Sequence, residues 1–368
     1  MRRSSMKTTL CERALPNALL MPNGKTVSSK EEWESIMRPH WTRLFWEEEY
    51  GQMPLKVIPQ IKVIPKEVDF AGKGIWEEIS FTFHKDGKTH TVLTQLIYPR
   101  EKKNNPFFIM LNFRADIPDR YLPVEEILDN GFGVFSVCYN DVTKDDADFT
   151  DGLAGLFQKG ERNGNDAGKL VYWSYMALQM MDYLQTLDIA NKNQIGVVGH
   201  SRLGKTALIT AIADERFAFV CANDSGCSGA ALSRGKKVGN ETLRDITKKF
   251  PYWFCPNYIN YVDKEQKLPF DQHCLLSLIA PRAAYIGAAI EDVWADNEGQ
   301  FLACKAASAV WKLYGKKGLI SPNRIPLNEE SYTKGELGFY LRNGKHYLSR
   351  TDWNIYMKAV KRYFKLKK

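Results

Sequence analysis

The 368-residue chain is predicted to form an α/β fold, with a mostly parallel central sheet, helices on both faces of the sheet and an N-terminal hairpin. Continuous apolar runs, typical of strands buried on both faces, recur along the chain. Helical patterns lie between several of these runs, and strands that alternate with helices indicate a parallel sheet with right-handed crossovers. The apolar runs are 107–113, 133–139, 194–199, 218–222, 283–289 and, more weakly, 337–341. The helical patterns are 169–187, 204–213, 299–314 and 352 to about 365.

Residues 1–60 are predicted to form an N-terminal extension and a helix that packs on the core. A Ser29-x-x-Glu32 capping box opens this helix, which runs to about Glu49 with apolar residues at helical spacing. Pro39 lies inside the helix and predicts a kink or a break there.

The main domain, predicted to run from 61 to 368, begins with the hairpin. Residues 77–84 and 89–98 alternate apolar and polar side chains around an Asp-Gly turn, which is a strong hairpin signal. The segment 223–280 interrupts the alternation of strands and helices. It is long and aromatic, and is predicted to form an irregular insert beside the active face.

The composition is that of a globular protein, with 44% hydrophobic and 12% aromatic residues. The net charge is +8, and the C-terminal tail 361–368 is basic. Such charge attracts anionic polymers, but no nucleic-acid-binding motif accompanies it, so a solvated terminal helix is the favoured interpretation. No apolar run approaches the roughly 20 residues that span a bilayer. We therefore expect no nucleic-acid or membrane partner, and a monomer.

The N-terminus and the cysteines bear on the cellular compartment. The N-terminus is basic but lacks the apolar stretch of a signal peptide. The chain as given is therefore expected in the cytoplasm, or in the periplasm or outside the cell if a leader was removed. The seven cysteines are odd in number and form no C-x-x-C pair, so neither a zinc framework nor a disulfide scaffold is predicted.

The segment 199–206, GHSRLGKT, supports two interpretations. It matches the pattern of a phosphate-binding P-loop, which would make Lys205 the phosphate ligand and the protein an NTPase. It also resembles a nucleophile elbow, in which a strand, a tight turn at Ser201 and a helix expose a catalytic serine. The segment 219–224 resembles the Walker-B strand of a P-loop protein. The stretch between Lys205 and this segment, however, is long enough for little more than one helix. The motif also lies deep in the chain, so the elbow of an α/β-hydrolase fold is favoured.

A catalytic serine needs a base, and in α/β-hydrolases the order along the chain is serine, acid, histidine. Of the six histidines, only His273 and His346 follow Ser201 beyond its immediate neighbours. His346 lies in a glycine-containing loop after the last predicted strand, where a base is expected. His273 precedes the fifth apolar run and is expected to pack or to cap.

Four carboxylates could orient the base. Glu291, Asp292 and Asp296 follow the apolar run 283–289, and Asp224 follows the run before it. Asp292 lies closest to the expected turn position and is favoured, with Asp224 as the second candidate. At least one of the four is expected only to support a loop by accepting backbone N–H bonds.

Arg202 and Lys205 lie in the first turn of the helix behind Ser201, where cations oppose the helix dipole at a cost of about 0.3–1 kcal/mol each. Two cations that oppose the helix dipole beside a candidate nucleophile indicate a functional role. The helix N–H groups and the Arg202 guanidinium could stabilise a tetrahedral oxyanion, and Lys205 could bind a substrate oxygen. The alternative is that both are ordinary surface cations.

From about Leu15 to the C-terminal helix, these motifs resemble those of the glucuronoyl esterases, carbohydrate esterase family 15. The segment 199–208, Gly-His-Ser-Arg-Leu-Gly-Lys-Thr-Ala-Leu, is similar to the bacterial form of the family's nucleophile motif. The other matching segments are 223–234, 239–242, 252–255, 268–273, 292–296 and 344–346.

The resemblance implies cleavage of the ester between 4-O-methyl-glucuronic acid on xylan and an alcohol of lignin. It implies no metal and no organic cofactor. The implied catalytic residues are Ser201 as nucleophile, His346 as base, Asp292 and Asp224 as alternative acids, and Arg202 at the oxyanion. The implied sugar-binding residues are Lys205, Glu241 and Trp294.

The chain also departs from the family pattern. Fungal members carry a disulfide between the positions of His200 and Tyr347, so the bacterial subgroup fits better. Asp224 stands where many relatives have a longer glutamate, and Lys248-Lys249 lies near where relatives often present an amide to the sugar. Another carbohydrate esterase, such as an acetyl xylan esterase, and a catalytically inactive carbohydrate-binding protein are the alternatives.

Overall fold

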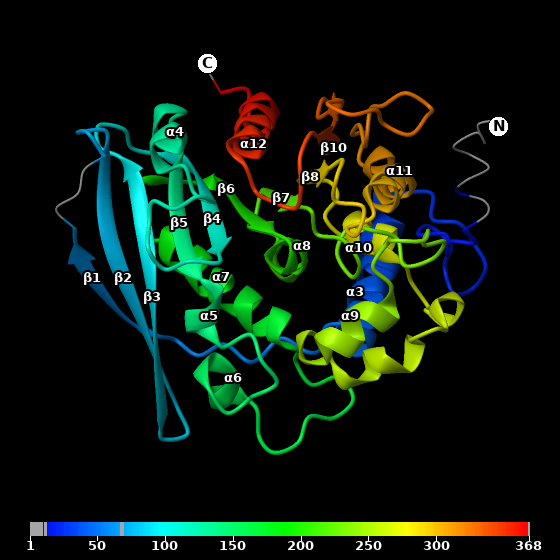
Figure 1. Ribbon diagram of the computed structural model, residues 1–368, viewed down its shortest axis with the longest axis horizontal. Coiled ribbons are helices and arrows are strands. Elements are labelled where there is room, and N and C mark those ends of the chain that lie inside the picture. The colour runs from blue at the N-terminus through cyan, green and yellow to red at the C-terminus, as the bar shows by residue number, and fades with distance from the viewer. Residues whose placement is uncertain (1–9, 11–12, 67–69, 367–368) are drawn as a thin grey trace.

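The computed structural model describes residue 10, residues 13–66 and residues 70–366 of the chain, so Cys11 and the last two lysines of the basic tail lie outside the described residues. Its centre is a ten-stranded sheet with the order β1-β2-β3-β5-β4-β6-β7-β8-β10-β9 (Figure 1). The neighbours from β5 through β4, β6, β7 and β8 to β10 pair in parallel, whereas β1, β2, β3 and β9 pair antiparallel. The predicted sheet and N-terminal hairpin are confirmed.

The strands coincide closely with the predicted apolar runs. The edge strands β1 and β9 were not predicted, because β1 is mostly exposed without an alternating pattern and β9 is only two residues long. The strands are β1 (Gln60–Pro65), β2 (Gly74–Lys85), β3 (Lys88–Pro99), β4 (Asn105–Asn112), β5 (Gly133–Cys138), β6 (Ala190–His200), β7 (Phe219–Asn223), β8 (Ala283–Ala289), β9 (Ser331–Tyr332) and β10 (Leu337–Arg342).

The four long helices predicted after residue 160 are all present. Short helices of four to seven residues were missed, because they are too short to show a helical period. The helices are α2 (Lys30–Glu32), η1 (Trp33–Met37), α3 (Arg38–Glu48), α4 (Val124–Asp129), α5 (Tyr139–Val142), α6 (Gly152–Phe157), α7 (Lys169–Leu184), α8 (Arg202–Ala213), α9 (Leu243–Lys249), η2 (Pro251–Trp253), η3 (Pro256–Tyr261), η4 (Glu265–Lys267), α10 (Gln272–Ser277), α11 (Asn297–Leu313) and α12 (Arg350–Tyr363).

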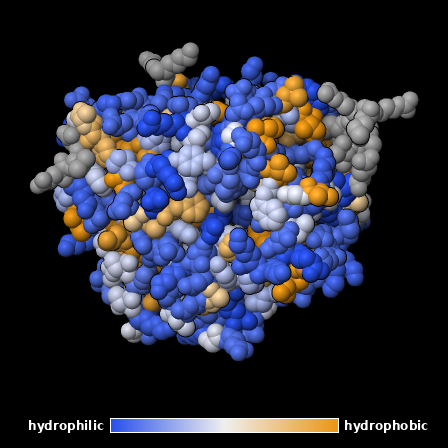
Figure 2. Space-filling model, in the orientation of Figure 1, coloured by the Kyte–Doolittle hydropathy of each residue, from blue (hydrophilic) through white to orange (hydrophobic). Residues whose placement is uncertain are grey.

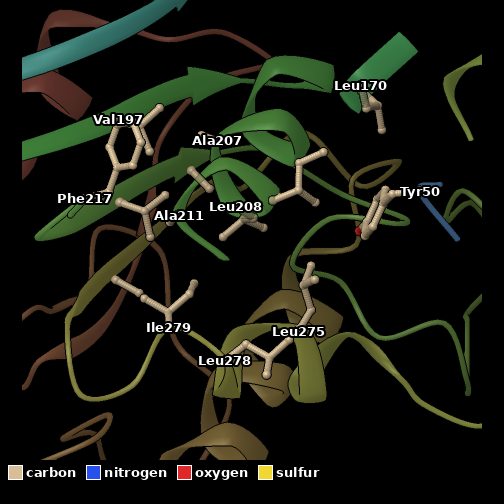
Figure 3. Close-up of a cluster of buried hydrophobic side chains, with 14 of the residues drawn as sticks. Tyr50, Leu170, Val197, Ala207, Leu208, Ala211, Phe217, Leu275, Leu278 and Ile279 are labelled. Atoms are coloured by element: carbon tan, nitrogen blue, oxygen red, sulfur yellow. The ribbon is translucent and has the colours of Figure 1, made fainter. Parts of the chain in front are cut away.

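Helices cover both faces of the sheet, as predicted. The apolar sides of α4 and α12 pack on one face, around residues such as Phe108 and Trp353, whose rings lie 5.2 Å apart. The other face is covered by α7, α8 and α11, which share one large core. Figure 3 shows part of this core, where Val197 of β6 and Leu208 of α8 lie among buried apolar side chains. The helix that begins at the elbow is therefore anchored along its length.

The N-terminal helix passes through Pro39 without breaking. A π-helical turn over Trp33–Met37 joins α2 to α3, so the backbone adapts just before the proline, which has no N–H to donate. Half of the predicted capping box is formed: the Ser29 side chain accepts from the Glu32 N–H at 3.2 Å, whereas the Glu32 carboxylate accepts from the Ser28 N–H at 2.8 Å. The buried stripe of this helix packs on the main domain, and the Phe45 ring lies 4.2 Å from the ring of Phe270.

The insert around 223–280 is more ordered than the predicted irregular segment. It contains α9, three short 3₁₀ helices and α10. A capping box of Thr242 and Asp245 opens α9, and its two residues are a helix-start signal in the sequence. Trp253, Phe254 and Tyr258 are buried and fix the insert against the core.

The six described cysteines are buried and free, as expected of small core residues. Among the described residues, no helix combines the length and the apolar character that crossing a bilayer requires. The face drawn in Figure 2 is mainly hydrophilic, and its apolar residues form separate small patches.

Candidate active site

A single-residue turn at Ser201 joins β6 to α8. Ser201 has φ 59° and ψ −126°, a strained conformation for any residue with a side chain, and its side chain does not cap the helix. The two flanking glycines are needed for close approach. A Cβ atom at Gly199 would lie 2.1 Å from the Leu203 carbonyl oxygen, and one at Gly204 would lie 3.0 Å from the Asn223 carbonyl oxygen. This strand, strained turn and helix form a nucleophile elbow.

The P-loop interpretation of the same segment is wrong. A P-loop requires a loop between strand and helix to wrap phosphate groups. Here β6 continues through His200 and α8 begins at Arg202, so Gly204 and Lys205 already lie in the first helical turn. The Lys205 ammonium donates to the Ser225 carbonyl oxygen at 2.5 Å.

His346 and Asp292 form a close pair. The Nδ1 atom of His346 lies 2.6 Å from Oδ2 of Asp292. Asp292 is buried, whereas the side chain of His346 is 44% exposed. Because an ionised carboxylate only accepts hydrogen bonds, this contact places the imidazole proton on Nδ1 and leaves Nε2 free to accept a proton.

Asp224 lies beside this pair but bonds elsewhere. Its Oδ1 accepts the Ala289 N–H at 2.9 Å, and its Oδ2 lies 3.5 Å from the Arg342 guanidinium. One ligand atom each of Asp224, Asp292 and His346 lies within 4.8 Å of the others. Burial, and then the neighbouring Asp292, hold the pKa of the Asp224 carboxyl well above its ordinary value. The two acids therefore differ in role although they share one sheet edge.

Arg202 is held at the edge of the cavity by a partner that sequence reasoning missed. Its guanidinium forms an ion pair with Asp145, which also accepts from the Trp253 indole N–H at 2.6 Å. The guanidinium lies 4.7 Å from the centre of the Trp253 ring and 5.3 Å from that of Phe250. Asp145 belongs to an acid-rich loop after the strand β5, and that run of acids was the available signal.

The implied sugar-binding residues surround the other side of the cavity. Burial lowers the pKa of the Lys205 ammonium, and the nearby Glu241 carboxylate opposes this shift. Glu241 is mostly buried, and its backbone N–H donates to the Trp294 carbonyl oxygen at 2.9 Å. Trp294 is 51% exposed and lies at the rim.

All eight site residues singled out in the sequence line one cavity of about 380 Å³. They come from the carboxyl ends of β6, β7, β8 and β10 and from the insert. Sequence reasoning missed the remaining lining residues except Lys249. The cavity is lined by Ser201, Arg202, Lys205, Asp224, Gly226, Glu241, Asp245, Lys249, Phe250, Trp253, Asp292, Trp294, Ala295 and His346.

The rejected candidates have structural partners. His273 is buried, and its Nε2 lies 2.8 Å from the Pro16 carbonyl oxygen, as expected of a packing residue. Asp296 caps α11 by accepting the Gly299 N–H at 2.8 Å and pairs with Lys236 at 3.0 Å. Glu291 is exposed and is not among the residues that line the cavity.

Comparisons with known proteins agree with this geometry. A protein-family model described as "Glucuronyl esterase, fungi" matches residues 81–315. The carbohydrate esterase MZ0003, from an unknown prokaryotic organism, is 31% identical over 388 residues, which cover 93% of this chain and 88% of that protein. The 4-O-methyl-glucuronoyl methylesterase of Schizophyllum commune is 25% identical over 312 residues, covering 82% and 74%.

The solved structures include a bacterial relative of nearly the same extent. The glucuronoyl esterase from Solibacter usitatus is 29% identical and superimposes with a TM-score of 0.87, covering 95% of this chain and 97% of that one. The family model, the extent of the curated relatives and this superposition lead to one conclusion. The chain belongs to the glucuronoyl esterases, carbohydrate esterase family 15, and has their α/β-hydrolase fold.

Proposed function

We propose that this protein is a serine esterase that hydrolyses the ester between 4-O-methyl-glucuronic acid of glucuronoxylan and a lignin-type alcohol. The observation that carries the proposal is the strained Ser201, which lines the same cavity as the Asp292-bound His346. Two of the relatives named above support the substrate class, because they are described as a glucuronoyl esterase and a 4-O-methyl-glucuronoyl methylesterase.

In the first half-reaction, Nε2 of His346 takes the proton of Ser201 Oγ as the oxygen attacks the ester carbonyl carbon. Asp292 holds Nδ1–H of His346 at 2.6 Å and stabilises the imidazolium that forms. The imidazolium then donates its Nε2 proton to the leaving alcohol, and the glucuronoyl group remains bound to Ser201 as an ester. In apo enzymes the serine–histidine bond commonly tightens only when substrate binds.

The second half-reaction runs through the same groups. His346 takes a proton from water, the hydroxide oxygen attacks the acyl carbon, and Ser201 Oγ leaves with the returned proton. Negative charge develops on the carbonyl oxygen in both steps. In this mechanism the backbone N–H groups at the start of α8 and the Arg202 guanidinium, which is held by Asp145, stabilise it.

The sugar occupies the side of the cavity formed by Lys205, Glu241 and Trp294. The buried ammonium and carboxylate can bind hydroxyl oxygens of the ring, and the exposed indole offers an apolar face. We assign the orienting role to Asp292, because Asp224 is bonded to Ala289 and Arg342 instead.

A Ser201→Ala variant tests the proposal with benzyl glucuronate as the substrate. We expect kcat to fall by about 10⁴-fold or more, because the nucleophile is lost, while the circular-dichroism spectrum and melting temperature stay close to those of the parent. Retained cleavage would contradict the serine mechanism. Parallel rates on acetylated xylan separate a glucuronoyl esterase from an acetyl xylan esterase, since the proposal requires the glucuronate ester to be preferred.

A further inference from the structure

The ring of His346 packs against His200, the residue that precedes Ser201. His200 is the last residue of β6 and is only 3% exposed. The centre of its ring lies 4.4 Å from the centre of the His346 ring, with an angle of 43° between the planes. Tyr121 stacks behind His200 at 6.0 Å. His346, which is open to solvent on its outer side, thus packs against a second imidazole on its inner side.

Hydrogen bonds fix the orientation and tautomer of His200. Its Nδ1 lies 2.6 Å from Oδ1 of Asn223, and Nδ2 of Asn223 donates to Asp352 at 3.1 Å. Because the Asp352 carboxylate only accepts, the amide nitrogen of Asn223 must face it and the amide oxygen must face His200. The His200 proton therefore lies on Nδ1, and the ring cannot flip without losing this bond.

Asn223 is held by a buried network of hydrogen bonds around Asp352. Asp352 is fully buried and accepts from the Tyr340 hydroxyl at 2.7 Å, from Nε of Arg342 at 2.8 Å and from the Ser349 N–H at 2.6 Å. Arg342 also donates to backbone carbonyl oxygens of the loop that carries His346, including that of Asn343 at 2.9 Å. His200, through Asn223, and the loop that carries His346, through Arg342, are thus anchored to the same buried carboxylate.

The surroundings of His200 favour its neutral form. Burial, and then the neighbouring His346, hold the pKa of the His200 imidazole well below its ordinary value. The ionisable groups around the two rings include Asp292 on the base, Asp224 and Arg342 beside it, and Asp352 beyond Asn223. A neutral ring at this position can stay in contact with His346 while His346 gains and loses its proton.

We propose that His200 is a positioning residue for the base. Its neutral, hydrogen-bonded imidazole fixes the ring of His346 between Asp292 and Ser201, so that Nε2 stays aimed at the nucleophile. The inference rests on the serine mechanism of the proposed function. His200 touches neither the substrate nor the reacting atoms, and it acts only through the ring of His346.

Two substitutions separate the ring contact from the hydrogen bond. His200→Phe keeps an aromatic ring against His346 but loses the bond to Asn223. His200→Asn keeps a donor near the position of Nδ1 but removes the ring. The measurements are the melting temperature, kcat and KM on benzyl glucuronate, and the rate at which a serine-directed fluorophosphonate labels Ser201.

We expect His200→Asn to lower both kcat and the labelling rate by about 10- to 100-fold, because small displacements of a catalytic group cost rates of this order. Its KM should stay within about twofold. His200→Phe should keep both rates within about threefold of the parent, although it melts at a lower temperature because the buried oxygen of Asn223 loses its donor. The rates therefore follow the ring contact and not the hydrogen bond.

The proposal is overturned if His200→Asn labels and turns over like the parent, or if His200→Phe loses at least as much rate as His200→Asn. If His200→Phe does not fold, the comparison of His200→Asn with the parent still decides. Labelling does not depend on the sugar. If the parent protein is labelled at Ser201 but does not cleave glucuronate esters, the proposed substrate is therefore contradicted. The labelling rates of the two His200 variants still test this inference.

Discussion

The two sides of the cavity are built in different ways. The strand-end side includes Ser201 and Asp224, at the carboxyl ends of β6 and β7, and Arg342 of β10 pairs with Asp224 at 3.5 Å. Its side chains are fixed by strand backbone and by buried ion pairs, such as that of Arg342 with Asp352 at 2.8 Å. The rim consists of Lys249, the last residue of α9, and Trp294, in the loop after β8, which are both largely exposed.

This difference separates chemistry from recognition. Proton transfer and oxyanion stabilisation need groups held to within fractions of an ångström, and a buried frame supplies this. Recognition at the rim tolerates more freedom, and exposed residues there can be exchanged without disturbing the core, unlike the buried Lys205 and Glu241. Substitutions on the strand-end side and in its bonded partners should therefore change kcat, whereas those on the rim should change KM.

The largest effect is expected for the acid that holds the base. Asp292→Ala should lower kcat by about 10³- to 10⁴-fold, since His346 loses the partner that fixes its tautomer. Asp224→Asn should lower kcat by about tenfold or less, because an amide oxygen can still accept the Ala289 N–H. Steady-state kinetics on benzyl glucuronate measure both variants. A reversed order would assign the orienting role to Asp224, and equal losses would show that the two acids share it.

A smaller effect, on KM and not on kcat, is expected for substitutions at the rim. Trp294→Ala should raise KM by about three- to tenfold, because an apolar face for the sugar is lost, and leave kcat within about twofold. Trp294→Phe is the matched control and should recover most of the affinity. A loss confined to kcat would show that the rim takes part in the chemistry and would remove the distinction between the two sides.

The smallest effect on activity is expected at Glu49, beneath the insert. Burial raises the pKa of Glu49 from 4.5 to about 8, although the Gln272 amide donates to both of its oxygens, at 3.1 and 3.0 Å. The folded protein therefore holds this proton between pH 4.5 and about 8, where the unfolded chain has released it. The free energy of unfolding should fall as pH rises through this window, by up to about 1.4 kcal/mol per pH unit.

Urea unfolding of Glu49→Gln between pH 5 and 8 measures this contribution. The variant should match the parent near pH 5, become the more stable protein near pH 8, and keep the parent's kcat. Glu31→Gln, at an exposed position, serves as the control and should leave the slope unchanged. A parent whose stability rises with pH across the window would show that Glu49 folds in its charged form.

The fold and the members of the site were largely predictable, because they depend on local patterns. Buried strands such as β8 appear as continuous apolar runs, and the elbow motif marks Ser201. The chain order of nucleophile, acid and base left few choices for His346 among six histidines. The implied sugar-binding residues came from the family resemblance, and the structure places all of them in the same cavity.

The remaining features depend on contacts between distant segments. Asp145 holds Arg202 from a loop 57 residues away, and no periodicity links the two. The choice between Asp224 and Asp292 was open because both follow parallel strands that end at one edge of the sheet. Only the three-dimensional register shows that Asp292 reaches His346 while Asp224 is engaged by Arg342.

The strained backbone at Ser201 has an evolutionary consequence. A side chain in this conformation costs about 1–3 kcal/mol, and glycine would relieve most of it at an entropic cost of at most about 1 kcal/mol. Selection for thermal stability alone would thus favour loss of the nucleophile. Catalytically silent descendants of such an enzyme should carry glycine at this turn while keeping the rest of the cavity, and engineering for heat tolerance must hold position 201 fixed.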